Sequence, residues 1–214
     1  IDGDYLEFGV FKGDSFIEAY EVCENAKKWN SKKFNQLAFE NKKNANDNFE
    51  RLNVKKDMRY FAFDSFEGLP KETGEDGKHP RFHEGRFKSS KNFFLSSCKL
   101  NNLDLSKVIV CEGFYENSLN KNFLNAHNLH KAAIVMIDCD LLSSTKQVLN
   151  FITPILQNGT ILIFDDWFTY KGIKNKGQQK AVSDWLIQNK DISIVEHARY
   201  GKSQKSFIVN IGIE

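Results

Sequence analysis

The sequence of 214 residues predicts an α/β fold with a mostly parallel seven-stranded sheet, a final antiparallel strand and helices on both faces. Three observations support this prediction. Short apolar runs alternate with helix-like stretches, which favours parallel strands joined by right-handed crossovers. Two of the runs end in pairs of Asp residues, as expected of neighbouring strands that deliver acids to one edge of a sheet. The last two runs have only a short polar connection, which suits an antiparallel hairpin.

The predicted elements follow one another along the whole chain. Seven apolar runs predict the strands, at residues 5–10, 60–63, 108–111, 132–137, 160–164, 192–196 and 206–211. Helix-like stretches lie between most of them, at residues 15–28, 91–99, 144–156 and 178–188. We expect these elements to form a single domain that spans residues 1–214, since this length suits one well-filled α/β domain.

Two regions do not fit the alternation. Residues 30–57 are rich in Lys and Asn and hold few apolar anchors, so we expect a polar helical excursion there. Residues 67–90 contain several Gly and two Pro residues and follow directly on a strand that ends in an acid. Long irregular segments at the ligand edge of a fold are often lids, so we expect an insert that acts as a lid.

The composition excludes several kinds of protein. The 30 basic and 28 acidic residues are interspersed, so we expect neither nucleic acid nor a membrane surface as a partner. No apolar stretch approaches the roughly 20 residues of a membrane span, and the first residues of the sequence show no signal-peptide pattern. The four Cys residues lack metal-ligand spacing, so we expect a reducing cytoplasm. The chain does not begin with Met, so we expect a fragment or a preceding segment.

The acids at two strand ends are the most informative feature. Asp138 and Asp140 follow one apolar run, and Asp165 and Asp166 follow the next. Ligands bind at the carboxyl edge of the sheet in open α/β folds. Three or four carboxylates gathered there would suit a hard divalent cation such as Mg²⁺. A structural capping role for all four is the weaker alternative, because carboxylates so close together repel one another.

A glycine turn after the first strand suggests a cofactor. Glu7, Phe8 and Gly9 end this strand, and Gly13 precedes a helix that Asp14 or Ser15 would cap. The spacing is not that of the dinucleotide fingerprint. It is nearer the Glu-x-Gly-x-x-x-Gly turn that meets the amino-acid end of S-adenosylmethionine. An ordinary strand-to-helix turn is the open alternative.

The ends of the second and third strands extend this cofactor prediction. Asp64 is placed to accept hydrogen bonds from both ribose hydroxyls of an adenosine cofactor, or else to cap a loop. Gly113 and Phe114 suit an adenine slot, with backbone contact to the base and an aromatic wall against its face. Among the five His residues, His83 beside Glu84 is our candidate for an acid–base element.

Taken together, these motifs resemble the macrocin O-methyltransferase family. The resembling segments run from Gly3 to Val10 with Gly13, from Asp64 to Pro70, Gly113–Phe114, from Ile137 to Leu141 with Ser144–Thr145, from Asp165 to Trp167, and Gly177 with Lys180, Ala181 and Val182. The resemblance implies a Rossmann-like class I methyltransferase that uses S-adenosylmethionine and a divalent cation to methylate a sugar hydroxyl. It also allows a homo-oligomer.

The resemblance assigns roles to residues of this chain. It implies cofactor contacts at Glu7, Gly9, Ser15, Asp64, Ser65 and Gly113, and metal ligands at Asp138, Asp165 and Asp166. We expect Phe8, Gly13, Phe114 and Asp138 to contribute to the cofactor site as well. Asp138 or a lid residue would accept the proton of the hydroxyl. Because the lid differs from the family pattern, the acceptor is not carried over beyond a sugar or glycosylated small molecule.

Three alternatives stay open at this point. One is a metal-dependent methyltransferase that acts on a catechol-type small molecule. A nucleotide-sugar transferase is disfavoured, because the first-strand glycine turn and the pair Asp165–Asp166 would then have no function. The third is a non-catalytic cofactor-binding domain of a larger protein. Retention of every candidate metal carboxylate argues against it.

Overall fold

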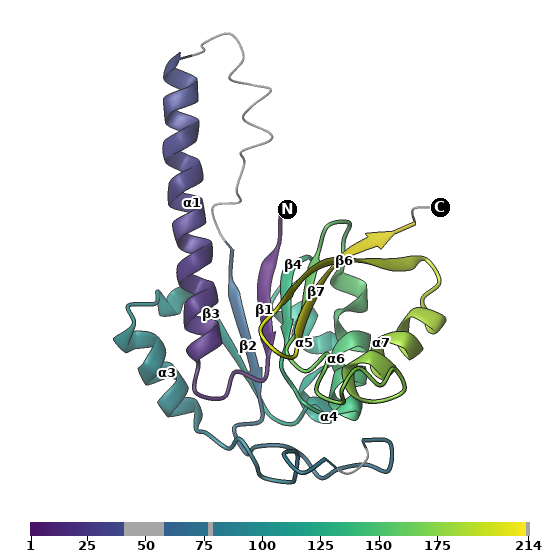
Figure 1. Cartoon of the computed structure of the whole chain (residues 1–214). Coiled ribbons are helices and arrows are strands. Elements are labelled where there is room, and N and C mark those ends of the chain that lie inside the picture. Colours follow the sequence, from purple (N-terminus) through teal and green to yellow (C-terminus); the bar gives the residue numbers. More distant parts are fainter. Residues whose placement is uncertain (41–57, 77–78, 213–214) are drawn as a thin grey trace.

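The computed structural model describes residues 1–40, 58–76 and 79–212, with side chains except at 30, 31 and 34–40. Its strands form one seven-stranded sheet (Figure 1). Their order across the sheet is β3 (Val108–Glu112), β2 (Tyr60–Asp64), β1 (Asp4–Phe8), β4 (Ala132–Ile137), β5 (Ile161–Phe164), β7 (Gln204–Ile211) and β6 (Ile192–Tyr200).

The pairing confirms the predicted fold class. Strands β3, β2, β1, β4 and β5 pair in parallel, and β1 lies between β2 and β4. The last strand, β7, is antiparallel to both β5 and β6, so β6 and β7 form the predicted hairpin. Strand order reverses beside β1, and ligands bind at such switch points in α/β folds.

Helices cover both faces of the sheet, as predicted. Figure 1 shows α1 (Asp14–Glu40) and α3 (Lys91–Leu100) on one side. The other side carries α4 (Tyr115–Ser118), α5 (Lys121–Ala126), α6 (Leu142–Ile152) and α7 (Gly177–Gln188). Two short 3-10 turns, at Leu105–Lys107 and Thr153–Ile155, complete the described elements.

Side chains along the central strands point alternately to the two faces of the sheet, so the core has two layers. Phe8, Phe61 and Phe63 point into the layer under α5, α6 and α7, while Tyr5 and Tyr60 point into the layer under α1 and α3. Because parallel strands are buried on both faces, these strands are mostly apolar and not alternately polar, apart from two buried acids in β1 and one at the end of β2. Phe8 and Phe63 stack with ring centroids 4.4 Å apart, which fixes β1 against β2.

Several boundaries differ from the predictions. Strand β1 ends at Phe8 and not at residue 10, because Gly9 leaves the extended conformation with φ +92°. Helix α1 continues beyond residue 28 to Glu40, so part of the expected polar excursion at 30–57 is helix. Residues 41–57 of that excursion lie outside the described residues. Helices α4 and α5 were not predicted, since each is too short to show a period.

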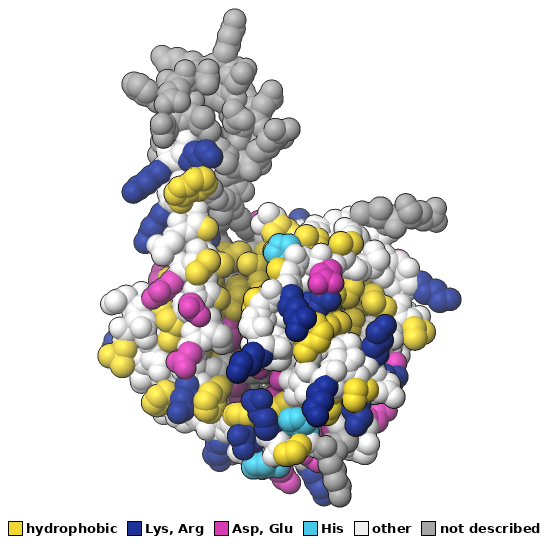
Figure 2. All heavy atoms as spheres, in the orientation of Figure 1, with side chains coloured by type: hydrophobic (Ala, Val, Ile, Leu, Met, Phe, Trp, Pro, Cys, Tyr) yellow, Lys and Arg dark blue, Asp and Glu magenta, His cyan; other side chains and the backbone are white. Residues whose placement is uncertain are grey.

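The surface agrees with the mixed charge of the sequence. Figure 2 shows both basic and acidic side chains on this face, interspersed with apolar and uncharged ones. Within the described parts of the chain, no helix is both long and apolar enough to cross a membrane.

Candidate active site

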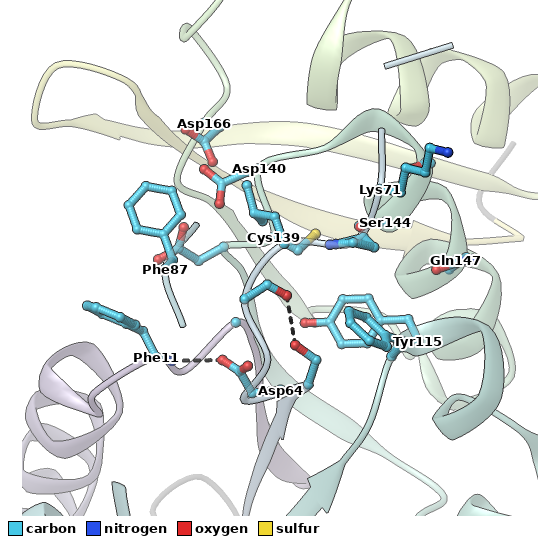
Figure 3. Close-up of a pocket in the computed structure, with 18 of the residues that line it drawn as sticks. Phe11, Asp64, Lys71, Phe87, Tyr115, Cys139, Asp140, Ser144, Gln147 and Asp166 are labelled. Atoms are coloured by element: carbon cyan, nitrogen blue, oxygen red, sulfur yellow. Dashed lines mark hydrogen bonds between the residues drawn. The ribbon is translucent and has the colours of Figure 1, made fainter. Parts of the chain in front are cut away.

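A cavity of about 350 Å³ opens at the carboxyl edge of the sheet (Figure 3). Its wall combines the ends of β1, β2, β4 and β5 with the start of α4 and the first turns of α6. The expected lid closes another side; we call its described part, residues 67–76 and 79–90, the lid segment. This volume is within the usual range for a small-molecule site.

The predicted cofactor residues divide into two groups. Those that line the cavity are Gly9, Asp64, Ser65, Phe114 and Asp138. Those that do not line it are Glu7, Phe8, Gly13, Ser15 and Gly113. All three predicted metal ligands, Asp138, Asp165 and Asp166, line the same cavity.

Asp64 is held in place by the backbone around it. Its Oδ2 accepts a hydrogen bond from the Phe11 amide at 2.8 Å, and its Oδ1 accepts one from the Phe66 amide at 2.7 Å. The residue is 8% exposed, and burial raises the pKa of its carboxyl although these amide hydrogen bonds oppose the shift. Each carboxylate oxygen accepts more than one hydrogen bond, so both can still receive hydroxyl groups from the cavity.

Glu7 lies beneath the cavity, fully buried on the α1 side of β1. Its Oε1 accepts a hydrogen bond from the Ser15 hydroxyl at 2.6 Å, and its Oε2 accepts one from the Tyr5 hydroxyl. The structure therefore brings Glu7 and Ser15 together, but as a buried link between β1 and the first turn of α1. Burial raises the pKa of Glu7 from 4.5 to about 7, against the opposing effect of these two hydrogen bonds.

This raised pKa predicts a pH-dependent stability. A carboxyl whose pKa is higher in the folded state favours folding when protonated, so its contribution is full below about pH 4.5 and declines as the pH rises through about 7. Glu7→Gln, which mimics the protonated form, should therefore gain about 2–3 kcal/mol relative to the wild type between about pH 5 and pH 8.5. Urea unfolding at four pH values measures this difference. If the free energy of unfolding changed with pH by the same amount in both proteins, Glu7 would not titrate in this range.

Three carboxylates meet at the ends of β4 and β5. One oxygen each from Asp138, Asp165 and Asp166 lies within 4.8 Å of the others. The parallel register explains this convergence, because β4 and β5 pair from Ile134 to Ile137 and both end at the same level. A set of three carboxylates of this size matches the oxygen ligands that Mg²⁺ or Ca²⁺ prefers.

Neighbouring side chains hold these acids but leave one oxygen without a partner. Gln204 of β7 donates a hydrogen bond to Asp165 Oδ1 at 3.0 Å, and Thr169 donates one to Asp166 Oδ1 at 2.7 Å. Gln178, 1% exposed, accepts one from the Asp166 amide and donates one to the carbonyl of Ile137. Asp166 Oδ2 is buried and has no hydrogen-bond partner among the described residues. A buried acceptor oxygen without a hydrogen-bond donor is expected of a ligand that would contact a cation.

The cluster concentrates negative charge. Burial, followed by the charges of Asp165 and Asp166, raises the pKa of Asp138 well above its usual value. Burial and the nearby Asp166 carboxylate likewise raise the pKa of Asp140 to about 8, although the positive charge of Arg81 opposes this rise. Figure 3 shows Asp140 and Asp166 side by side at this end of the cavity. The acids therefore favour a neutralising positive charge.

The cavity also has an aromatic side. Phe11, in the turn after β1, packs edge-to-face against Phe87 of the lid segment with centroids 6.1 Å apart. Both residues and Asp140 have positive φ, between 47° and 61°. Non-glycine residues in this region carry backbone strain, which is found most often at functional sites.

Several lining residues were missed from the sequence. The lid segment contributes Lys71, Thr73 and Arg81, which its fold brings to the cavity without a local signal. Gln147 lies one turn beyond Ser143 on α6, so helical spacing from that residue could have found it. His83 is exposed and does not line the cavity; its ring approaches only the carbonyl of Glu84 at 3.3 Å among described contacts.

Solved structures share this fold. The O-methyltransferase NovP and the calicheamicin methyltransferase CalS11 each superpose with a TM-score of 0.66 at 19% identity, covering 97% of this chain and 72% of theirs. The O-methyltransferase TomG from Streptomyces achromogenes gives 0.53 at 12% identity, covering 96% of this chain and 71% of its own. At such identities the likeness shows the fold alone.

Family membership rests on the sequence itself. No curated protein matches the chain. The family model of macrocin O-methyltransferase (TylF) matches residues 48–190, which is more than half of the chain. This match includes the ends of β2, β3, β4 and β5, and hence most of the cavity wall. The chain therefore belongs to the macrocin O-methyltransferase family and is an S-adenosylmethionine-dependent O-methyltransferase.

Proposed function

We propose that this enzyme methylates a hydroxyl group of a sugar or glycosylated small molecule and that a divalent cation assists the reaction. One observation carries the proposal: a single cavity joins the Gly9–Asp64 side of the sheet to the acidic cluster at β4 and β5. CalS11 is described as a TDP-rhamnose 3'-O-methyltransferase, which supports a sugar acceptor for this family member as well. We also propose that residues 1–214 act as one domain, since the sheet draws strands from both ends of the chain.

The cofactor side of the cavity supplies binding and orientation. Bound S-adenosylmethionine brings the reactive methyl group on a sulfonium, so the protein contributes mainly alignment. We propose that the Asp64 carboxylate accepts hydrogen bonds from the ribose, and that Phe114 lies against the adenine. Gly9 allows the turn after β1 to approach the cofactor without a side chain between them.

The acidic side would hold the metal. Asp138, Asp165 and Asp166 fit a cation such as Mg²⁺ because they offer hard oxygens, one of them buried without a partner among the described residues. A bound cation would act as a Lewis acid that lowers the pKa of the acceptor hydroxyl. We propose that Asp138, which faces the same cavity, accepts the proton. We give His83 no role, because it lies outside the cavity lining.

Replacing Asp64 tests the cofactor assignment. Asp64→Ala should weaken binding of S-adenosylhomocysteine by about 1–3 kcal/mol, because charge-assisted hydrogen bonds to the ribose are lost. Glu112→Ala is the matched control, since Glu112 ends the adjacent strand opposite Asp64 but does not line the cavity. Calorimetry gives both affinities. Equal affinities for the two variants would show that the ribose does not bind at the Asp64 carboxylate.

The acceptor class can be tested by methyl transfer. Purified enzyme with labelled S-adenosylmethionine, with and without Mg²⁺, should methylate members of a panel of free sugars, nucleotide sugars and glycosides. Transfer to catechols and to no sugar would instead support a catechol-type methyltransferase. Cofactor binding without transfer to either class, across a broad panel, would favour a non-catalytic domain.

A further inference from the structure

Helix α6 begins at the cavity without a cap of its own. Its N-cap residue is Leu141, whose side chain makes no capping hydrogen bond. Helix starts leave several backbone N–H groups without partners, and a Ser, Thr, Asp or Asn at the N-cap usually accepts one of them. The first turns of α6 carry Ser143, Ser144 and Gln147 into the cavity wall, so the position of this helix start shapes the site.

Asp76 of the lid segment supplies the missing cap. Its Oδ1 accepts a hydrogen bond from the Ser143 amide at 2.7 Å, and its Oδ2 accepts one from the Ser143 hydroxyl at 2.9 Å. Ser143 is the second residue of α6, where a local N-cap side chain would normally bond. A residue 67 positions earlier in the chain thus acts as the cap.

Asp76 also accepts hydrogen bonds from within the lid segment. Its Oδ2 also accepts hydrogen bonds from the Thr73 amide at 2.7 Å and the Thr73 hydroxyl at 2.8 Å. Asp76 is 4% exposed although residues 73–75 beside it are exposed. One buried carboxylate therefore joins Thr73, which lines the cavity from the lid segment, to Ser143, which lines it from α6.

Other contacts also join the lid segment to the body, and they include the Phe11–Phe87 ring contact and a hydrogen bond of 3.4 Å from the Tyr170 hydroxyl to the Asp76 carbonyl, both of which Asp76→Ala would retain. Leu69 and Phe82 bury against Leu141 in a small apolar cluster separate from the two core layers. The pair Glu75–Lys146, at 2.7 Å, lies at the surface with Glu75 mostly exposed and Lys146 partly exposed, and so contributes little. Loss of Asp76 should therefore loosen the segment locally, while the sheet and both core layers stay folded.

We propose that Asp76 is a positioning residue: it caps α6 from the lid segment and so keeps the two walls of the cavity together around the bound cofactor. The inference rests on our assignment of this cavity to the cofactor. It predicts that the cap slows cofactor release, because Asp76 joins Thr73 of one wall to Ser143 of the other and we expect these walls to separate when the cofactor leaves.

The test compares Asp76→Ala with a control that removes a similar cap elsewhere. Asp104 accepts hydrogen bonds from the Ser106 amide at 3.0 Å and the Ser106 hydroxyl at 2.7 Å, at a 3-10 turn outside the cavity lining. In Asp76→Ala, amide exchange should rise in residues 67–76 and 140–146, and S-adenosylhomocysteine should dissociate about tenfold faster in a surface-plasmon measurement. Asp104→Ala should change neither quantity.

The outcomes separate the inference from the proposed function. Faster exchange in Asp76→Ala with an unchanged dissociation rate would overturn the positioning role, and unchanged exchange would overturn the cap. If Asp76→Ala does not fold, Asp76→Asn, which retains one acceptor oxygen, should show the same local changes to a smaller degree; their absence would also overturn it. A wild-type protein that does not bind S-adenosylhomocysteine would refute the cofactor site itself, whatever the exchange pattern.

Discussion

Asp138→Asn and Asp165→Asn should each lower methyl transfer by about 10³-fold, because a metal that stabilises the reacting oxygen contributes several kcal/mol. Affinity for S-adenosylhomocysteine should stay within a few-fold, since neither replacement alters Asp64 or the turn after β1. Assays with Mg²⁺, and with an excess of chelator, measure the effect. Undiminished activity of the wild type in chelator would show that these carboxylates do not hold an essential metal.

A stability measurement separates this loss of function from misfolding. Without added metal, both Asn variants should melt no lower than the wild type, because each removes a carboxylate that repels its neighbours. Added Mg²⁺ or Mn²⁺ should raise the melting temperature of the wild type by mass action and leave the variants unchanged. Asp104→Asn, which changes a charge outside the cavity, should respond to metal as the wild type does.

Gly9→Ala should have the largest effect on stability, about 4 kcal/mol or more. A Cβ at this position would lie 1.8 Å from the backbone oxygen of Asp138, and φ is +92°. The neighbouring backbone has little freedom to move away, because Gly9 donates to the Phe63 carbonyl at 2.8 Å and Asp138 donates to the Phe8 carbonyl at 2.9 Å. Since small domains are stable by only about 5–15 kcal/mol, much of this margin would be lost.

Gly74→Ala is the matched control for this change. Gly74 lies in the lid segment, and a Cβ added there would have no heavy atom within 4 Å beyond its chain neighbours. Denaturant unfolding should therefore give Gly74→Ala a stability within about 0.5 kcal/mol of the wild type. A similarly small effect for Gly9→Ala would mean that the ends of β1 and β4 can separate, contrary to the packing described above.

The sequence predicted the sheet well, because its signals are local. Buried parallel strands are largely continuous apolar runs, and each run in this chain overlaps a strand, although β6 continues four residues beyond its predicted run of 192–196. Strand ends also identified Asp64, Asp138, Asp165 and Asp166 as residues of one edge, and all four line the cavity. These four acids lie together because the carboxyl ends of neighbouring parallel strands meet at the same edge of the sheet.

The remaining features depend on contacts that no local pattern records. Glu7 precedes a glycine turn typical of a cofactor contact. Because side chains alternate along β1, however, Glu7 points to the α1 side of the sheet, where Tyr5 and Ser15 donate hydrogen bonds to it. Arg81 reaches the cavity through the fold of the lid segment, and Gln204 reaches Asp165 through the β6–β7 hairpin. Asp76 looks like a loop residue in the sequence, and only the structure shows that it caps α6.

We propose that one cavity holds both the cofactor and the metal. The most direct test is a crystal structure with S-adenosylhomocysteine and Mn²⁺, in which anomalous scattering locates the metal. We expect a single anomalous peak bound by Asp138, Asp165 and Asp166, with the ribose hydroxyls at the Asp64 carboxylate. Cofactor density away from Asp64, or a cavity that contains cofactor but no metal at saturating Mn²⁺, would refute this shared site.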